Sequence, residues 1–157
     1  MADLLVNLLN LPERAPTLAA LGPQNVIVRR ARTFEATPAQ LFVAENFSRN
    51  WADEISVGFS RQPVSIFLAT IDKKIVGFAA YECTARAYFG PEGVAPEYRR
   101  RGVGKALLLS ALWGLRELGY VYGIIGGAGP VEFYERCVGA IVIPGSDPGL
   151  YTDKLKG

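Results

Sequence analysis

Residues 94–105 read VAPEYRRRGVGK and lead directly into the apolar run ALLL at residues 106–109. This order predicts the end of a strand, a basic turn that contains glycine, and the first turn of a helix. A helix start carries backbone N–H groups without partners and the positive end of the helix dipole, so it attracts phosphate. Three arginines reinforce that charge, and Gly102 and Gly104 lack the Cβ atom that would keep a bulky anion away from the backbone. The stretch therefore predicts a site for a polyanionic ligand.

The composition of the chain is typical of one globular domain. Half of the 157 residues are hydrophobic and 20% are charged, which allows a sizeable buried core. The net charge of +2 is too small to indicate a nucleic-acid partner. The basic residues gather instead between Arg99 and Lys105, which favours one small polyanion bound at one place.

The residue types restrict which catalytic groups the protein can use and indicate its cellular compartment. No histidine is present, so acid or base chemistry falls to carboxylates, tyrosine, cysteine or water. Cys83 and Cys137 fit no zinc spacing, so we expect no metal and a reduced, cytoplasmic protein. The leucine run at residues 4–9 has no basic leader and is interrupted by Asn7. We therefore expect neither a signal peptide nor a membrane span.

The first 24 residues are expected to lie outside the main domain, which would take in residues 25–157. Leucines at positions 4, 5, 8 and 9 predict a short amphipathic helix over residues 3–11. This helix would either pack on the domain's own surface or form a homodimer contact. Residues 12–24 contain several prolines and Gly22, which indicates a linker.

From residue 25 onward, short apolar strands and amphipathic helices follow one another. The helices are expected over 38–47 and 51–59, from the basic turn to Leu118, and around residues 133–137. The strands are expected at 25–31, 65–71, 74–82, 87–94, 120–125, 140–143 and 151–155. Asp72 and Lys73 would close a hairpin, and Gly77 indicates a bulge or a close approach within its strand. Pro91 cannot donate a hydrogen bond to a neighbouring strand, so the strand at 87–94 must open there.

Two motifs resemble one known family. Arg99-x-x-Gly102-x-Gly104 resembles the acetyl-CoA pyrophosphate signature of the GCN5-related N-acetyltransferases (GNAT). Phe133-Tyr134-Glu135-Arg136 with Gly139-Ala140 resembles a later element of that family, and the order of elements over residues 25–155 resembles its whole domain. The resemblance implies an α/β (α+β) fold: a mixed, mostly antiparallel sheet of six to seven strands with helices on both faces. The chain departs from the family pattern at 126–128, where Gly-Gly-Ala replaces the usual asparagine.

The resemblance also implies an enzyme, an acyl-CoA-dependent N-acyltransferase. Such an enzyme transfers an acetyl group from acetyl-CoA directly to a primary amine of a small molecule or peptide. The alternative is a non-catalytic acyl-CoA-binding or protein-interaction module of the same fold. An intact Tyr134 and the two glycines favour the enzyme.

The resemblance assigns roles to particular residues. Tyr134 matches the tyrosine that protonates the leaving thiolate, and backbone groups near Val94 would bind pantetheine and polarise the thioester carbonyl. The pyrophosphate would be held by the turn, whose residues are Arg99, Arg100, Arg101, Gly102, Val103, Gly104 and Lys105. The acceptor groove would lie along residues 32–62 and the turn at 145–151, with Trp51, Glu54 and Phe59 as candidate contacts.

Glu92 is the candidate general base. It lies two residues before Val94 in an apolar strand, where burial would disfavour ionisation and bring the carboxylate into the range of a base near neutral pH. A solvated carboxylate or a partner of a nearby arginine is the alternative for Glu92. Glu82 is the second candidate base, and water is the third.

Overall fold

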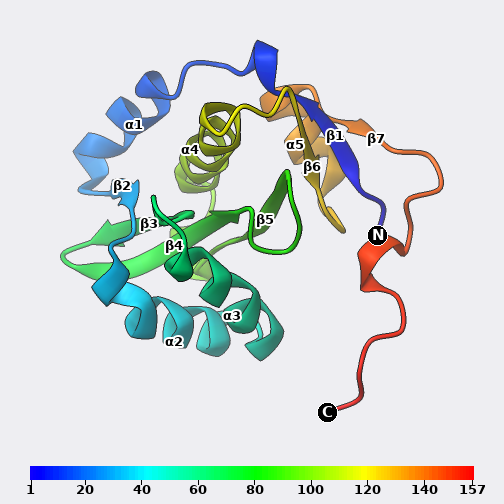
Figure 1. Cartoon of the computed structure of the whole chain (residues 1–157). Helices are drawn as coiled ribbons and strands as arrows, with labels where there is room; N and C mark the ends of the chain where they lie inside the picture. The colour runs from blue at the N-terminus through cyan, green and yellow to red at the C-terminus, as the bar shows by residue number, and fades with distance from the viewer.

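The computed structural model describes residues 1–157 and is built around a seven-stranded mixed sheet (Figure 1). The strands are β1 (Leu4–Asn7), β2 (Ile27–Arg30), β3 (Ile66–Ile71), β4 (Lys74–Tyr81), β5 (Tyr88–Val94), β6 (Tyr122–Ile125) and β7 (Ile141–Val142). They lie in the order β2-β3-β4-β5-β6-β1-β7. All neighbouring strands run antiparallel except β5 and β6, which are parallel. The expected mixed, mostly antiparallel sheet is confirmed.

Helices cover both faces of this sheet, as predicted. They are α1 (Ala15–Leu21), α2 (Ala36–Asn46), α3 (Arg49–Ser56), α4 (Val103–Glu117) and α5 (Val131–Val138). In Figure 1, α1 and α4 lie on one side of strands β2 to β4, and α2 and α3 lie on the other. Strand β3 shows why two cores form, because its side chains alternate between the faces. Phe67 and Ala69 join the core under α4, whereas Ile66 and Leu68 join the core under α2 and α3.

The hairpin between β3 and β4 follows its sequence signals. Asp72 and Lys73 both have positive φ, at 49° and 67°, as a two-residue hairpin turn requires. The pairing of β3 with β4 shifts between Ala69 and Thr70, next to Gly77. A Cβ atom on Gly77 would lie 3.0 Å from Leu107 Cδ1 and 3.2 Å from Gly93 O. Gly77 therefore permits the close approach of α4 to the sheet.

The expected helix at residues 3–11 is wrong, because this segment forms strand β1 and a 3-10 helix, Leu8–Asn10. Strand β1 lies between β6 and β7. Leu4, Val6 and Leu8 are buried in the main core, so the segment follows the two-residue period of a strand. A dimer contact through an N-terminal helix has no structural basis here. The expected linker also contains helix α1.

The strand expected at residues 151–155 is also wrong. The chain forms a 3-10 helix at Gly149–Tyr151, and β7 is the last strand of the sheet. The ring of Tyr151 instead packs on Gly127, where a Cβ atom would lie 3.3 Å from it. None of the helices combines the length and the apolar character that crossing a membrane requires.

Candidate functional site

The turn before α4 is shaped by backbone conformations that glycine favours. Gly102 is the residue that precedes the helix, with φ at 87°, and Arg100 also has positive φ, at 63°. No side chain caps the helix start. A Cβ atom on Gly104 would make ordinary van der Waals contacts without a clash, at 3.8 Å from Phe133 Cζ and 3.9 Å from Val94 Cγ2.

Six consecutive backbone N–H groups, from Arg100 to Lys105, donate no hydrogen bond within the protein. The first hydrogen bond into the helix comes from Ala106 N to Gly102 O, at 3.2 Å. Three of these free N–H groups belong to the first turn of α4, which also carries the positive end of the helix dipole. The turn thus offers an unfilled row of donors to an anion.

The basic side chains of the turn add positive charge without being neutralised. Arg99, Arg100, Arg101 and Lys105 are exposed, and none forms an ion pair. Arg99 Nε donates to Val94 O at 2.9 Å, and the Arg101 guanidinium lies 5.4 Å from the centre of the Tyr98 ring. The residues of the turn therefore fit a doubly charged pyrophosphate.

Strand β5 has an open edge beside this turn. Its pairing with β6 covers only two positions, Tyr88 with Ile124 and Phe89 with Ile125. Near the end of the strand, Ala95 N donates to Val76 O of strand β4 at 2.8 Å. Because N–H directions alternate along a strand, Val94 N–H points away from β4 and towards the open edge. The strand therefore opens beyond Phe89, as Pro91 predicted.

Glu92 lies on β5 between the opened pairing and the basic turn. The residue is partly exposed as a whole, but its Oε2 atom is buried and has no hydrogen-bonding partner. Burial raises the pKa of Glu92 well above its usual value. Glu92 forms no ion pair with an arginine, and its Oε2 atom is shielded from solvent.

Tyr134 is close to Glu92 and lies in the core between the basic turn and β5. It is 8% exposed, and its ring is 6.2 Å from that of Phe89 and 5.1 Å from that of Phe133. Burial raises the pKa of Tyr134, and the neighbouring Glu92 carboxylate raises it further. The phenol therefore remains protonated near neutral pH.

Glu82, the second candidate base, has a structural role. Its Oε1 accepts from the Tyr120 hydroxyl at 2.7 Å, and its Oε2 accepts from Ala87 N. Both carboxylate oxygens are thus used to hold the loop between β4 and β5. Glu82 lines a different hollow, together with Arg61 and Tyr120, and is not in the lining of the pocket that opens where β5 and β6 part.

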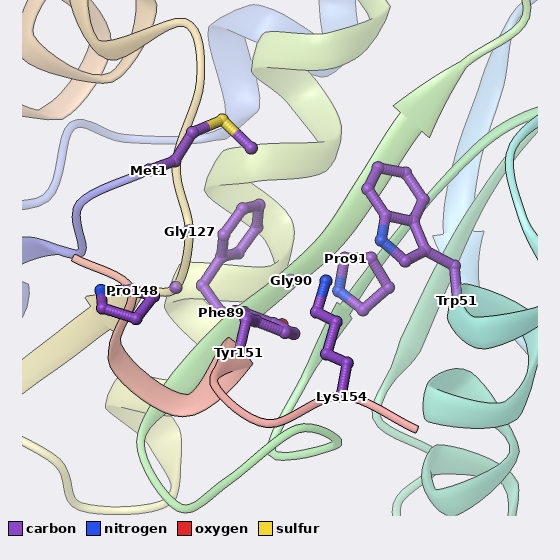
Figure 2. A pocket seen from close by; sticks show the side chains of 10 residues that line it. Met1, Trp51, Phe89, Gly90, Pro91, Gly127, Pro148, Tyr151 and Lys154 are labelled. Atoms are coloured by element: carbon purple, nitrogen blue, oxygen red, sulfur yellow. The ribbon is translucent and has the colours of Figure 1, made fainter. Parts of the chain in front are cut away.

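A pocket of about 280 Å³ opens where β5 and β6 part (Figure 2). Aromatic side chains line it from three different elements: Trp51 of α3, Phe89 of β5 and Tyr151 near the C-terminal end. Its complete lining is Met1, Trp51, Phe89, Gly90, Pro91, Gly126, Gly127, Pro148, Tyr151 and Lys154. The first half of β5 borders this pocket, and its second half carries Glu92 and leads to the basic turn.

The three candidate acceptor contacts lie in different places. Trp51 lines the pocket, and Glu54 lines an adjoining hollow that shares Trp51, Tyr151 and Lys154. Phe59 packs against the core under α2 and α3, so it does not reach the pocket. Where the family asparagine is usual, Gly127 N donates to Asp3 Oδ1 at 2.8 Å.

The turn at 145–151, which was expected beside the acceptor groove, contributes Pro148 and Tyr151 to the lining of the pocket, whereas sequence reasoning missed Met1 and Lys154, at the two ends of the chain. Met1 and Lys154 lie in its lining, and Asp3 joins the two ends because its backbone N–H donates to Ser146 Oγ at 2.8 Å. No motif marks these residues. Only the pairing of β1 with β6 and β7 brings them to the pocket.

Comparisons with known proteins agree with this architecture. Residues 62–137 match the model of the acetyltransferase (GNAT) domain. The solved structures that resemble the chain include the GCN5-related glucosamine N-acetyltransferase region of a fungal multi-domain GH3 beta-N-acetylglucosaminidase, at 16% identity and a TM-score of 0.73. Others are a GCN5-related N-acetyltransferase from Sphaerobacter thermophilus (18% identity, TM-score 0.65) and a GNAT family acetyltransferase from Brucella melitensis in complex with acetyl-CoA (18%, 0.56).

The similarity covers 90%, 90% and 71% of this chain, respectively. The chain spans 19% of the fungal protein, 48% of the Sphaerobacter protein and 80% of the Brucella protein. No curated protein matches the chain in sequence. The resemblance seen in the two motifs is thus confirmed at the level of the fold: the chain has the fold of the GCN5-related N-acetyltransferases, and its residues 62–137 match the model of the acetyltransferase (GNAT) domain.

Proposed function

We propose that the chain is an N-acetyltransferase that transfers the acetyl group of acetyl-CoA directly to a primary amine of a small molecule or peptide. The observation that carries this proposal is the row of six unpaired backbone N–H groups from Arg100 to Lys105. Such a row, reinforced by unpaired basic side chains, suits a pyrophosphate. The Brucella melitensis structure, which has the same fold, contains acetyl-CoA.

Acetyl-CoA supplies the acetyl group as a thioester and carries the pyrophosphate by which it is recognised. The N–H groups of residues 100–105 would hold that pyrophosphate, with Arg99, Arg100, Arg101 and Lys105 neutralising its charge. Val94 N–H, at the open edge of β5, would donate to the thioester carbonyl as negative charge develops on oxygen. Because the two reactants are held side by side, no protein nucleophile is needed.

Glu92 and Tyr134 would carry out the two proton transfers of the reaction, as general base and general acid. The amine must lose protons to attack, and a carboxylate whose pKa is raised by burial accepts one near neutral pH. The thiolate of the departing coenzyme is stabilised when it gains a proton, and the protonated phenol of Tyr134 is the candidate donor. Water remains an alternative route from the amine to Glu92.

Calorimetric titration with acetyl-CoA tests the binding half of the proposal. Gly104→Asp is the sharpest variant, because a Cβ atom there meets nothing closer than 3.8 Å and the new carboxylate would face the pyrophosphate. We expect its Kd to rise by about 100-fold, since like charges brought together cost several kcal/mol. Asn10→Asp makes the same change of charge at an exposed site near the other end of α4, and it should bind normally.

Turnover is then measured against a panel of primary amines. Tyr134→Phe should keep acetyl-CoA binding and lose about 100-fold or more in turnover, as expected for a general acid. Equal affinity in Gly104→Asp and wild type would remove the pyrophosphate site from the turn. Folded wild type that binds acetyl-CoA but acetylates no amine would favour the non-catalytic module instead.

A further inference from the structure

A primary amine of the chain itself lies in the pocket. Lys154 is the only lysine in the lining, and Figure 2 shows its side chain rising towards Gly90 and Pro91 at the opening of β5. Its Nζ lies 5.0 Å from the centre of the Tyr151 ring. The ammonium forms no ion pair, so no carboxylate holds it away from the pocket.

The pocket suits a lysine side chain. Aromatic rings of Trp51, Phe89 and Tyr151 offer apolar surface to an aliphatic stem and π faces to an ammonium. Asp53 and Glu54 line the adjoining hollow that also includes Lys154. These acids favour the approach of a cationic chain.

The segment before Lys154 is fastened to the body of the protein. Asp147 Oδ1 accepts from the Met1 amine at 2.8 Å, and Ser146 Oγ accepts from Asp3 N at 2.8 Å. Ile143 N donates to Asp3 O at 2.9 Å. These contacts hold the segment against β1, so Lys154 is presented to the pocket at a high effective concentration.

We infer that Lys154 is an acetyl acceptor of the protein's own site and is modified within the same molecule. This inference rests on the proposed function and names a lysine side chain in a peptide as an acceptor. In the reaction, the Nζ of Lys154 forms a bond to the acetyl carbon of acetyl-CoA as the carbon–sulfur bond breaks. The ammonium first loses one proton to water, the attacking amine then gives up a second to Glu92, and the sulfur leaves with its electron pair and takes a proton from Tyr134.

The other amines of the chain supply the contrast. The Met1 amine is engaged in an ion pair with Asp147 at 2.8 Å. Lys156 is exposed two residues beyond Lys154 and lines none of the described pockets. Lys73 and Lys74 lie at the hairpin of β3 and β4, and Lys105 lies in the basic turn; none of the three lines this pocket. Selective acetylation of Lys154 therefore requires the pocket rather than exposure alone.

The test incubates the purified chain with acetyl-CoA labelled in the acetyl group and measures incorporation at each lysine by mass spectrometry. We expect Lys154 to be labelled at least about tenfold faster than Lys156, because it is held in place. The fraction labelled per minute should not change with protein concentration. Lys154→Arg should remove most of the label, Lys156→Arg should leave it unchanged, and Tyr134→Phe should slow labelling of Lys154 by about 100-fold.

The outcomes separate this inference from the proposed function. Equal labelling of all exposed lysines, unaffected by Tyr134→Phe, would mean simple chemical acetylation and overturn the inference. A rate at Lys154 that rises in proportion to protein concentration would overturn the intramolecular reaction. If the chain binds acetyl-CoA and acetylates added amines while Lys154 stays unlabelled, the inference alone is wrong. If acetyl-CoA does not bind, both are wrong.

Discussion

Replacing Glu92 by glutamine is expected to remove a loss of stability that the wild type suffers as pH rises, while it slows turnover. The Glu92 Oε2 atom is buried without a partner, and burial raises its pKa well above the usual value. The unfolded chain releases this proton at about pH 4.3, whereas the folded chain retains it to higher pH. The wild type therefore loses stability as pH rises from the unfolded-state pKa to the folded-state pKa. Glu92→Gln has no such proton and escapes that loss.

The size of the effect follows from the displacement of the pKa. Each unit by which the folded-state pKa exceeds the unfolded-state pKa costs the wild type about 1.4 kcal/mol at a pH above both. Near pH 4 the raised pKa should contribute little to the difference in unfolding free energy between wild type and Glu92→Gln, because both side chains are neutral there. A buried amide without a partner costs about 1–3 kcal/mol at any pH. The change of the difference with pH, rather than its absolute value, is thus the diagnostic quantity.

The assay is urea unfolding of wild type and Glu92→Gln at several values between about pH 4 and pH 9. Glu97→Gln, an exposed carboxylate in the turn after β5, is the matched control and should follow the wild type. Turnover of Glu92→Gln should fall by about 100-fold or more, as for loss of a general base. A difference in unfolding free energy that stays constant with pH would refute the perturbed carboxyl. Unchanged turnover would refute its role as the base.

Three further predictions concern the scaffold, each measured by denaturant unfolding. Leu4→Ala should cost about 2–5 kcal/mol, because Leu4 is wholly buried in the main core; a negligible loss would contradict the placement of β1. Gly114→Ala should cost about 1–3 kcal/mol, since its Cβ would lie 2.5 Å from Tyr81 Cζ, and a neutral result would mean that the ring moves freely. The hydrogen-bonded guanidinium of Arg29 lowers the pKa of Glu35 to about 2, so this carboxylate stabilises the fold above about pH 4.3 and the benefit is lost as pH falls towards 2. Glu35→Gln should reduce this loss of unfolding free energy at low pH by about 1–2 kcal/mol after allowance for solvent screening. An unchanged loss would contradict the ion pair of Glu35 with Arg29 as its cause.

The parts of the fold that the sequence predicted are those with local signals. The basic turn and α4 were recognisable because glycines, arginines and a helical apolar stripe follow each other within a few residues. The hairpin of β3 and β4 was recognisable because Asp72 and Lys73 separate two apolar runs. In both cases the residues that determine the structure are neighbours along the chain.

The failures have a common physical cause, which is dependence on distant partners. The leucines of residues 4–9 satisfy a helical spacing and a strand spacing at once, and only β6 and β7 decide between them. Residues 151–155 have strand-like composition, but Tyr151 finds its place against Gly127 instead. Glu92 was identified as a candidate, yet the lack of a partner for its buried oxygen depends on the packing around β5.

The position of β1 has a consequence for how a newly made chain reaches its final state. Synthesis delivers the N-terminal end first, so β1 leaves the ribosome long before β6 and β7, the strands on either side of it. Until they arrive, its apolar side chains and both rows of backbone groups stay open to other partners. Closure of such a long loop is slow. The nascent protein therefore passes through a stage in which β1 has been synthesised but has neither of its partner strands. The yield of folded protein depends on what shields β1 during that interval.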